Sequence, residues 1–135
     1  MNKKLTQKLL NKYPKLFIQH KLPITESAMG WLFQCNDGWY WLINMLCSQL
    51  QFDIDRNNEP QLEFTTIKEK FGNLRLYHQG ASERQDGMID LISFMSNYTC
   101  EDCGSTSNVT KTKGYITTLC SKCMIDYKKK REVKK

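Results

Sequence analysis

The stretch CEDCGSTSNVTKTKGYITTLCSKC, residues 100–123, decides how the C-terminal part of this chain folds. It begins and ends with Cys-x-x-Cys, so Cys100 and Cys103 form one pair of thiols and Cys120 and Cys123 form the other, with sixteen residues between the pairs. This spacing is typical of a four-thiolate zinc site, whose sulfurs occupy the corners of a tetrahedron about 2.3 Å from the metal. We therefore expect one Zn²⁺ per chain at these cysteines, or iron taken up in its place during expression.

The segment between the two pairs fits a zinc ribbon, in which two metal-binding turns are joined by a β-hairpin. Gly104 follows Cys103 and can adopt the positive φ that directs backbone N–H groups at the sulfurs, and residues 115–119 are rich in β-prone side chains. Few apolar side chains lie within the ribbon, so the metal must supply much of its folding energy. Four thiolates leave no coordination position for water or substrate, which predicts a structural metal.

Two further cysteines, Cys35 and Cys47, lie in the N-terminal half of the chain. A total of six cysteines permits disulfides, but the paired spacing of the other four favours metal binding. No apolar segment of signal-peptide length follows the first residues, so we expect a reducing, cytoplasmic location. Cys35 and Cys47 are then expected to be buried free thiols that pack like small apolar residues.

The composition is that of a globular protein. The chain has 135 residues, of which 40% are hydrophobic and 25% are charged, and no stretch approaches the ~20 apolar residues that a membrane helix needs. This length allows one domain with a small appendage. We expect an α+β core domain at residues 1–98, the zinc ribbon at residues 99–127 and a basic tail at residues 128–135.

The spacing of apolar residues predicts two amphipathic helices in the core domain. Residues 38–53 carry large apolar side chains at helical spacing, and Asp37 stands where it can cap this helix. Residues 83–98 show similar spacing after a capping-box pattern, Ser82-x-x-Gln85. Shorter elements are expected as helices at residues 4–13 and 124–131 and a strand at residues 31–35.

A β-hairpin is expected between the two amphipathic helices. Its strands are predicted at residues 62–67 and 74–78, and Gly72 and Asn73 supply the positive φ that the turn needs. The predicted fold is therefore α+β, with two amphipathic helices packed on a β-hairpin and a C-terminal four-cysteine zinc ribbon. The core is expected to include Met88, Met95, Trp31, Trp39 and Trp41.

The positive charge is concentrated at the C-terminus. The formal net charge is +6, and residues 128–135 carry six Lys and Arg against one Glu, which leaves a net of only +1 for residues 1–127. Four thiolates with one Zn²⁺ would lower the total to about +4. A basic tail attracts phosphate backbones at long range, although a solvated terminus that binds nothing is an equal alternative.

A second basic cluster, Lys68, Lys70 and Arg75, lies around the predicted hairpin. Lys68 and Lys70 share one strand face, with Phe71 and Tyr77 near them. Cations interleaved with aromatic rings suit nucleic-acid backbones and stacked bases, whereas a solvated strand face with Glu69 as counter-charge is the simpler alternative. The nucleic-acid contacts predicted from sequence are Lys68, Lys70, Arg75, Lys128, Lys129, Lys130 and Arg131.

Five short stretches are distinctive in combination: LPITES at residues 22–27, CNDGW at 35–39, IKEKFGNLRLY at 67–77, TCEDCG at 99–104 and TLC at 118–120. In this order they resemble a group of small uncharacterised proteins carried by tailed bacteriophages and prophages. The resemblance covers about residues 20–123, is most specific at residues 68–77, and leaves out the basic tail. It implies a phage origin, a bacterial host cell and a zinc ribbon, but no activity. Some members have His at the position of Cys123, and either residue can bind zinc.

The sequence carries no Gly-rich phosphate loop, no HExxH, no GxSxG and no carboxylate pattern with metal spacing. We therefore expect a binding protein that is not an enzyme and has neither a membrane partner nor a small-molecule substrate. The expected partner is nucleic acid or a nucleoprotein complex. The alternative is a protein that binds and inhibits or modulates a host enzyme, such as a defence nuclease or RNA polymerase, by analogy with other small phage proteins.

Overall fold

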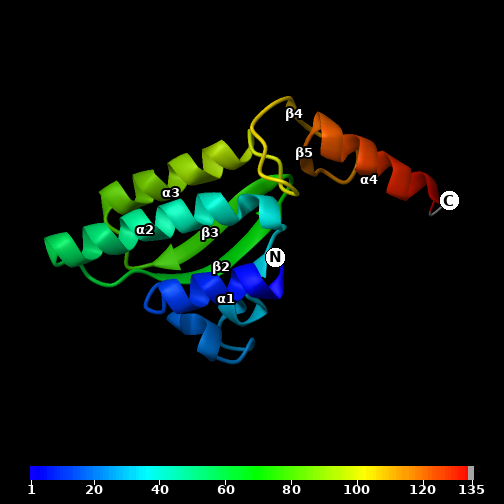
Figure 1. Cartoon of the computed structure of the whole chain (residues 1–135). Helices are drawn as coiled ribbons and strands as arrows, with labels where there is room; N and C mark the ends of the chain where they lie inside the picture. Colours follow the sequence, from blue (N-terminus) through cyan, green and yellow to red (C-terminus); the bar gives the residue numbers. More distant parts are fainter. Residues whose placement is uncertain (134–135) are drawn as a thin grey trace.

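The computed structural model describes residues 1–133 and shows a mixed α and β fold, as the sequence predicted (Figure 1). Its α-helices are α1 (Lys3–Lys12), α2 (Tyr40–Asn57), α3 (Glu83–Ser96) and α4 (Ser121–Val133). Its strands are β1 (Phe33–Gln34), β2 (Glu63–Lys70), β3 (Asn73–Gln79), β4 (Val109–Lys111) and β5 (Thr118–Cys120). Short 3₁₀ helices at Ile18–Lys21, Ala28–Trp31 and Asp37–Trp39 connect the first elements.

The larger sheet has the strand order β1-β2-β3. Strands β2 and β3 are antiparallel, and the two-residue strand β1 runs parallel to β2. The turn of the hairpin consists of Phe71 and Gly72, with φ of 55° and 76°, rather than Gly72 and Asn73. A two-residue turn of this type has positive φ at both of its central positions, which here are Phe71 and Gly72. Strand β2 therefore continues to Lys70 and β3 starts at Asn73, so both strands extend further toward the turn than the sequence predicted.

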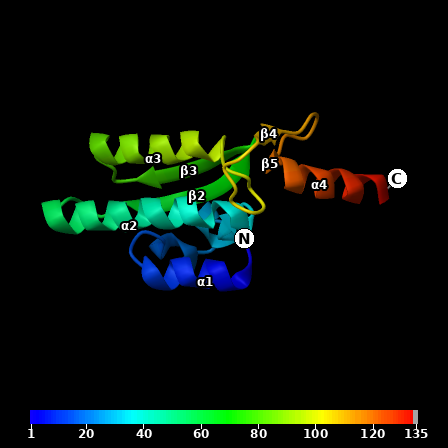
Figure 2. The same ribbon diagram turned by 45° about the horizontal axis from the view of Figure 1, so that its top comes forward.

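The main core lies between the sheet and the helices of the first hundred residues (Figures 1 and 2). Leu74 and Leu76 of β3 are buried there, as are Phe64 and Ile67 of β2, which lie three residues apart because the register of β2 shifts between Phe64 and Thr66. Ile67 and Leu76 are paired across the two strands. Apolar side chains of α2, among them Ile43 and Leu50, are buried in the same cluster. The other side of the two strands carries charged and polar side chains, so the alternation of period two leaves that face to solvent.

Helix α2 starts later and ends later than predicted. The 3₁₀ turn Asp37–Trp39 leads into the helix, and Asn57 is its last residue. The next residue, Asn58, has φ of 51° and ψ of 43°, a left-handed conformation that does not continue the helix. The predicted cap by Asp37 is wrong, because its carboxylate instead accepts hydrogen bonds from the backbone N–H (2.7 Å) and the side-chain Nδ2 (2.9 Å) of Asn2. The capping box of α3 is confirmed, with Ser82 and Gln85 bonded to each other in both directions.

Three of the residues predicted for the core lie on the surface. Trp31, Trp41 and Met95 are 59%, 64% and 41% exposed, whereas Trp39 is fully buried and Met88 packs against the core. Trp41 lies on the solvent side of a helix whose opposite side already fills the core. Helix α3 buries only a narrow face, with Gln85, Ile89 and Ser96 as its buried residues.

Most of the residues predicted as a basic tail lie in a helix. Helix α4 begins directly after Cys120, three residues earlier than predicted, and continues to Val133 through Lys128, Lys129, Lys130 and Arg131. The last two cations of the predicted tail, Lys134 and Lys135, lie outside the described residues. Within residues 1–133, no helix is long and apolar enough to span a membrane.

Candidate metal centre and basic surface

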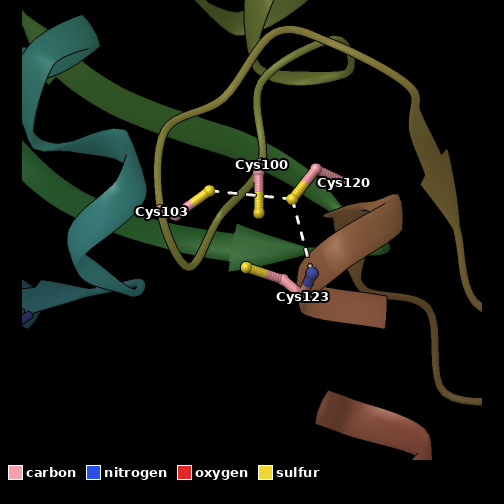
Figure 3. Close-up of side chains that lie close together, drawn as sticks. All are labelled: Cys100, Cys103, Cys120 and Cys123. Atoms are coloured by element: carbon pink, nitrogen blue, oxygen red, sulfur yellow. Dashed lines mark hydrogen bonds between the residues drawn. The ribbon is translucent and has the colours of Figure 1, made fainter. Parts of the chain in front are cut away.

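Four cysteines from three different elements meet near the C-terminal end of α3. Cys100 and Cys103 lie in the turn that follows α3, Cys120 ends β5, and Cys123 lies in the first turn of α4. The short antiparallel pair β4 and β5 brings the second Cys-x-x-Cys back to the first. The structure therefore brings together all four predicted metal ligands (Figure 3).

The geometry of these thiols suits a tetrahedral metal ion. The four sulfurs lie within 4.8 Å of one another and point toward one another, and Sγ of Cys103 lies 3.7 Å from Sγ of Cys120. Sulfurs bound at about 2.3 Å in a tetrahedron lie about 3.8 Å apart. The donor set consists of thiols alone, which suits zinc or iron rather than magnesium or calcium.

Backbone groups surround the sulfurs and prepare them for metal binding. The backbone N–H of Cys123 points at Sγ of Cys120 at 3.4 Å, and this hydrogen bond lowers the pKa of the Cys120 thiol to about 7. Gly104 has the predicted positive φ, at 83°, and its N–H donates to the carbonyl of Cys100 at 2.9 Å. Burial raises the pKa of the Cys123 thiol, which a bound cation would counteract.

The metal-binding turn is fixed to the core domain by buried hydrogen bonds. The backbone N–H of Gly38 donates to the carbonyl of Glu101 at 2.7 Å, and the indole Nε1 of Trp39 donates to the carbonyl of Thr99 at 2.9 Å. The carboxylate of Glu101 accepts the backbone N–H of Asn36 at 3.0 Å. These contacts hold the start of α2 against the candidate metal site.

A second contact joins the β4–β5 hairpin to the turn of the β2–β3 hairpin. Nζ of Lys111 donates to the carbonyl of Gly72 at 3.0 Å, to Oδ1 of Asn97 at 3.0 Å and to Oγ1 of Thr118 at 3.1 Å. The hydroxyl of Thr118 also donates to the carbonyl of Gly72 at 2.5 Å. Burial lowers the pKa of Lys111, and its three acceptors leave this cation as a structural group rather than a free contact for a ligand.

Cys35 and Cys47 are buried apart from the cysteine cluster, as predicted. Burial raises the pKa of the Cys35 thiol to about 12 and that of the Cys47 thiol well above its usual value. Both therefore remain protonated at neutral pH and pack as small apolar groups.

The predicted basic residues of the hairpin lie on the solvent side of the sheet. Lys68 is paired with Arg75 across β2 and β3, and Lys70 follows on the same face, opposite Asn73. Tyr77, 46% exposed, shares this face. Among residues 1–133, the buried Nε of Arg75 has no hydrogen-bond partner. The structure thus brings Lys68, Lys70 and Arg75 together in one cluster.

A groove of about 520 Å³ lies between the β4–β5 hairpin and α4. It is lined by Lys113 from the hairpin and by Tyr127, Lys128 and Arg131 from the helix, with Glu132 as an acidic neighbour. The guanidinium of Arg131 donates to the hydroxyl of Tyr127 at 3.0 Å, one helical turn away. Of the four predicted cations of α4, only Lys128 and Arg131 line this groove; Lys129 and Lys130 lie outside it.

A second groove, of about 350 Å³, lies beside Lys70 of the basic hairpin cluster, with Glu69 as an acidic neighbour. It lies between the turn of the larger sheet and the tip of the smaller one, and Lys70, Phe71 and Tyr115 line it. Sequence reasoning missed Lys113, Tyr115 and Tyr127 as surface partners. The spacing of Tyr127 and Arg131 at i, i+4 could have indicated Tyr127, but nothing local indicates that residues 113–115 lie beside residue 70.

Comparison of the chain with known protein families, with curated proteins and with solved structures finds no match. The resemblance to phage proteins therefore stays a prediction, and the function is argued from the site alone.

Proposed function

We propose first that the cysteine cluster binds one structural Zn²⁺ per chain. The all-thiol donor set and the 3.7 Å separation of two of its sulfurs support this. The hydrophobic cluster around it is small, and its buried members within residues 1–133 are Cys100, Leu119 and Cys120, so the ribbon depends on the metal for stability. Elemental analysis of reduced protein should give one zinc per chain, and clearly less metal, or iron in place of zinc after growth in zinc-supplemented medium, would contradict the proposal.

We propose second that the protein binds nucleic acid through a basic and aromatic surface that crosses the ribbon. The observation that carries this proposal is the groove beside α4, which Lys113, Lys128 and Arg131 line together with Tyr127. Cations neutralise phosphates, and an aromatic face in a cationic groove accepts an unpaired base. The second groove extends this surface toward the cluster of Lys68, Lys70 and Arg75.

Exposed rings along this surface favour a single strand over a duplex. Tyr115 is 73% exposed, Phe71 is 66% exposed, and each lies next to a Lys in the chain or in the groove. Bases in a duplex are stacked on each other and do not offer their faces to such rings, whereas a single strand does. The body of the chain is otherwise almost neutral, so binding is expected to be moderate and sensitive to salt.

The test measures fluorescence anisotropy of a labelled single-stranded oligonucleotide and of its duplex across a salt series. The variant Lys128→Ala with Arg131→Ala removes two cations from the groove. If both contact phosphates, the slope of log affinity against log salt should become shallower by about 1.4 for the single strand. A second variant, Tyr127→Leu, should cost roughly 1–3 kcal/mol on a single strand and less on the duplex.

The matched control is Lys3→Ala with Lys4→Ala, which removes the same charge from exposed positions of α1. The control should lower the affinity for the oligonucleotides much less and should leave the preference for the single strand over the duplex unchanged. Equal losses in both double variants would show that only the net charge matters. If the zinc-loaded protein binds neither oligonucleotide at low salt, the proposal fails, and the alternative, a protein that binds a host enzyme, takes its place.

A further inference from the structure

Helix α2 exposes an apolar stripe that the core does not use. Trp41, Met45 and Phe52 recur at i, i+4 and i+11, and all three are about half exposed or more. Buried residues such as Ile43, Leu50 and Ile54 occupy the opposite side of the same helix. Helix α2 therefore carries large apolar side chains toward solvent as well as toward the core, which an ordinary surface helix does not do.

Helix α3 exposes a second apolar stripe beside the first. Leu91 and Met95 recur at i and i+4, and Tyr98, in the turn just after the helix, places its ring 5.3 Å from that of Phe94. Leu91 follows Arg84 by seven residues, so both lie on one side of the helix. Nη1 of Arg84 bonds to Oδ1 of Asp53 at 3.2 Å, so this is the side of α3 that borders α2.

Helices α2 and α3 pack side by side (Figures 1 and 2), so the two stripes lie on neighbouring helices, and we call them together the α2–α3 apolar face. It consists of Trp41, Met45, Phe52, Leu91, Phe94, Met95 and Tyr98. Its four aromatic residues are 53–64% exposed, which corresponds to roughly 450 Å² of accessible surface before the three aliphatic residues are added. The largest apolar patch of an ordinary monomer covers about 300–600 Å² in total, and each partner in a stable complex buries about 800 Å².

The charges around this face permit contact with an identical face. No Lys, Arg, Asp or Glu lies between Trp41 and Phe52 on α2, so two copies would place no like charges at the centre of a contact. Asp86 and Asp90 of α3 point elsewhere, since Asp86 bonds to His78 of β3 at 3.3 Å and Asp90 follows one turn later on the same side, and Glu83 is the first residue of the helix, at the same end as Arg56. The cations of this side, Arg56, which packs over Phe52 at 5.7 Å, and Arg84, which is bonded to Asp53, both lie at one end of the face, where α2 ends and α3 begins.

We propose that the α2–α3 apolar face binds a second copy of this chain, so that the protein is a two-fold symmetric dimer. Helices α2 and α3 run antiparallel, because Asp53 near the end of α2 meets Arg84 near the start of α3. A two-fold axis that lies in the plane of the contact and runs perpendicular to both helices brings the Arg56 end of one copy to the Trp41 end of the other, where the guanidinium can contact exposed rings. The basic sheet face and the ribbon remain free on both copies.

The test is sedimentation equilibrium of the zinc-loaded protein from about 5 to 200 μM. The chain has a mass of 15.9 kDa, and the proposal expects a reversible shift to twice this mass as concentration rises. The variant Met45→Lys with Leu91→Lys places like charges across the axis and should weaken dimerisation by ~100-fold or more. The milder variant Trp41→Gln should weaken it in the same direction, in case the double variant does not fold.

The matched control is Leu22→Lys with Ile24→Lys, which adds the same charges at exposed apolar positions outside the face and should dimerise like the wild type. A wild type that stays at 15.9 kDa at 200 μM would overturn the proposal and leave the face to a different partner. Dimerisation that survives in folded Met45→Lys with Leu91→Lys, or that the control abolishes, would also overturn it.

Discussion

Substitution of Gly38 by Ala should separate the metal-binding ribbon from the core domain. A Cβ atom at this position would lie 2.2 Å from the carbonyl oxygen of Cys100 and 2.5 Å from the carbonyl carbon and oxygen of Glu101. All three are backbone atoms of the metal-binding turn, which the metal and neighbouring hydrogen bonds hold in place. The turn would have to retreat by about 1 Å to restore ordinary contact distances of 3.4 Å. The φ of Gly38 is not positive, so lack of space is the only obstacle to Ala.

The cost of this change can be estimated from the contacts that it breaks. Overpacking against a rigid backbone costs about 1–3 kcal/mol. The retreat also weakens the hydrogen bonds from Gly38 to Glu101 and from Trp39 to Thr99, each worth about 1 kcal/mol. We therefore expect a loss of about 3 kcal/mol in the free energy of unfolding, which lowers Tm by roughly 10 °C in a domain of this size.

The assay is thermal unfolding of zinc-loaded protein, followed by circular dichroism and by the fluorescence of the buried Trp39. The matched control is Gly87→Ala, because Gly87 lies inside α3 and a Cβ there meets no atom within 4 Å. This control should stabilise the protein slightly, by about 0.5–1 kcal/mol. Equal Tm values for Gly38→Ala and the wild type would refute the reasoning, since the ribbon would then not be fixed against the start of α2.

Three further predictions concern the other contacts. Alkylation at pH 8 should leave Cys35 and Cys47 unmodified in the folded protein, because a pKa of about 12 keeps the Cys35 thiol protonated and burial keeps the reagent away from both sulfurs. Peptide mass spectrometry measures the labelling, and labelling of either cysteine at the rate of a free thiol would disprove this. Ser82→Ala should lower the free energy of unfolding by about 1 kcal/mol through loss of the α3 capping box, whereas Ser82→Thr should retain most of it, and urea titration compares the two. Lys111→Met should cost about 1–3 kcal/mol because the carbonyl of Gly72 and the amide of Asn97 lose a charged donor, and unchanged urea midpoints would show that these bonds add nothing.

The sequence by itself identified the elements whose signals are local. The paired Cys-x-x-Cys spacing named all four residues of the cysteine cluster, because chemistry restricts which residues recur at that interval. The capping box at Ser82 and the positive φ of Gly104 followed from side-chain and backbone preferences of single residues. Helices and strands were located to within a few residues for the same reason, since periodicity is a property of contiguous sequence.

Only the tertiary structure decided which side of each element meets another element. Apolar periodicity placed Trp41 and Met95 in the core. Helices α2 and α3 each carry apolar residues on two sides, however, and in each helix packing buried one side and left the other exposed. Lys113 and Tyr127 share a groove because the β4–β5 hairpin folds back against α4. Gly38 touches Cys100 across more than sixty residues of chain. Contacts of this kind depend on how the buried faces of different elements fit together, and no local pattern encodes that fit.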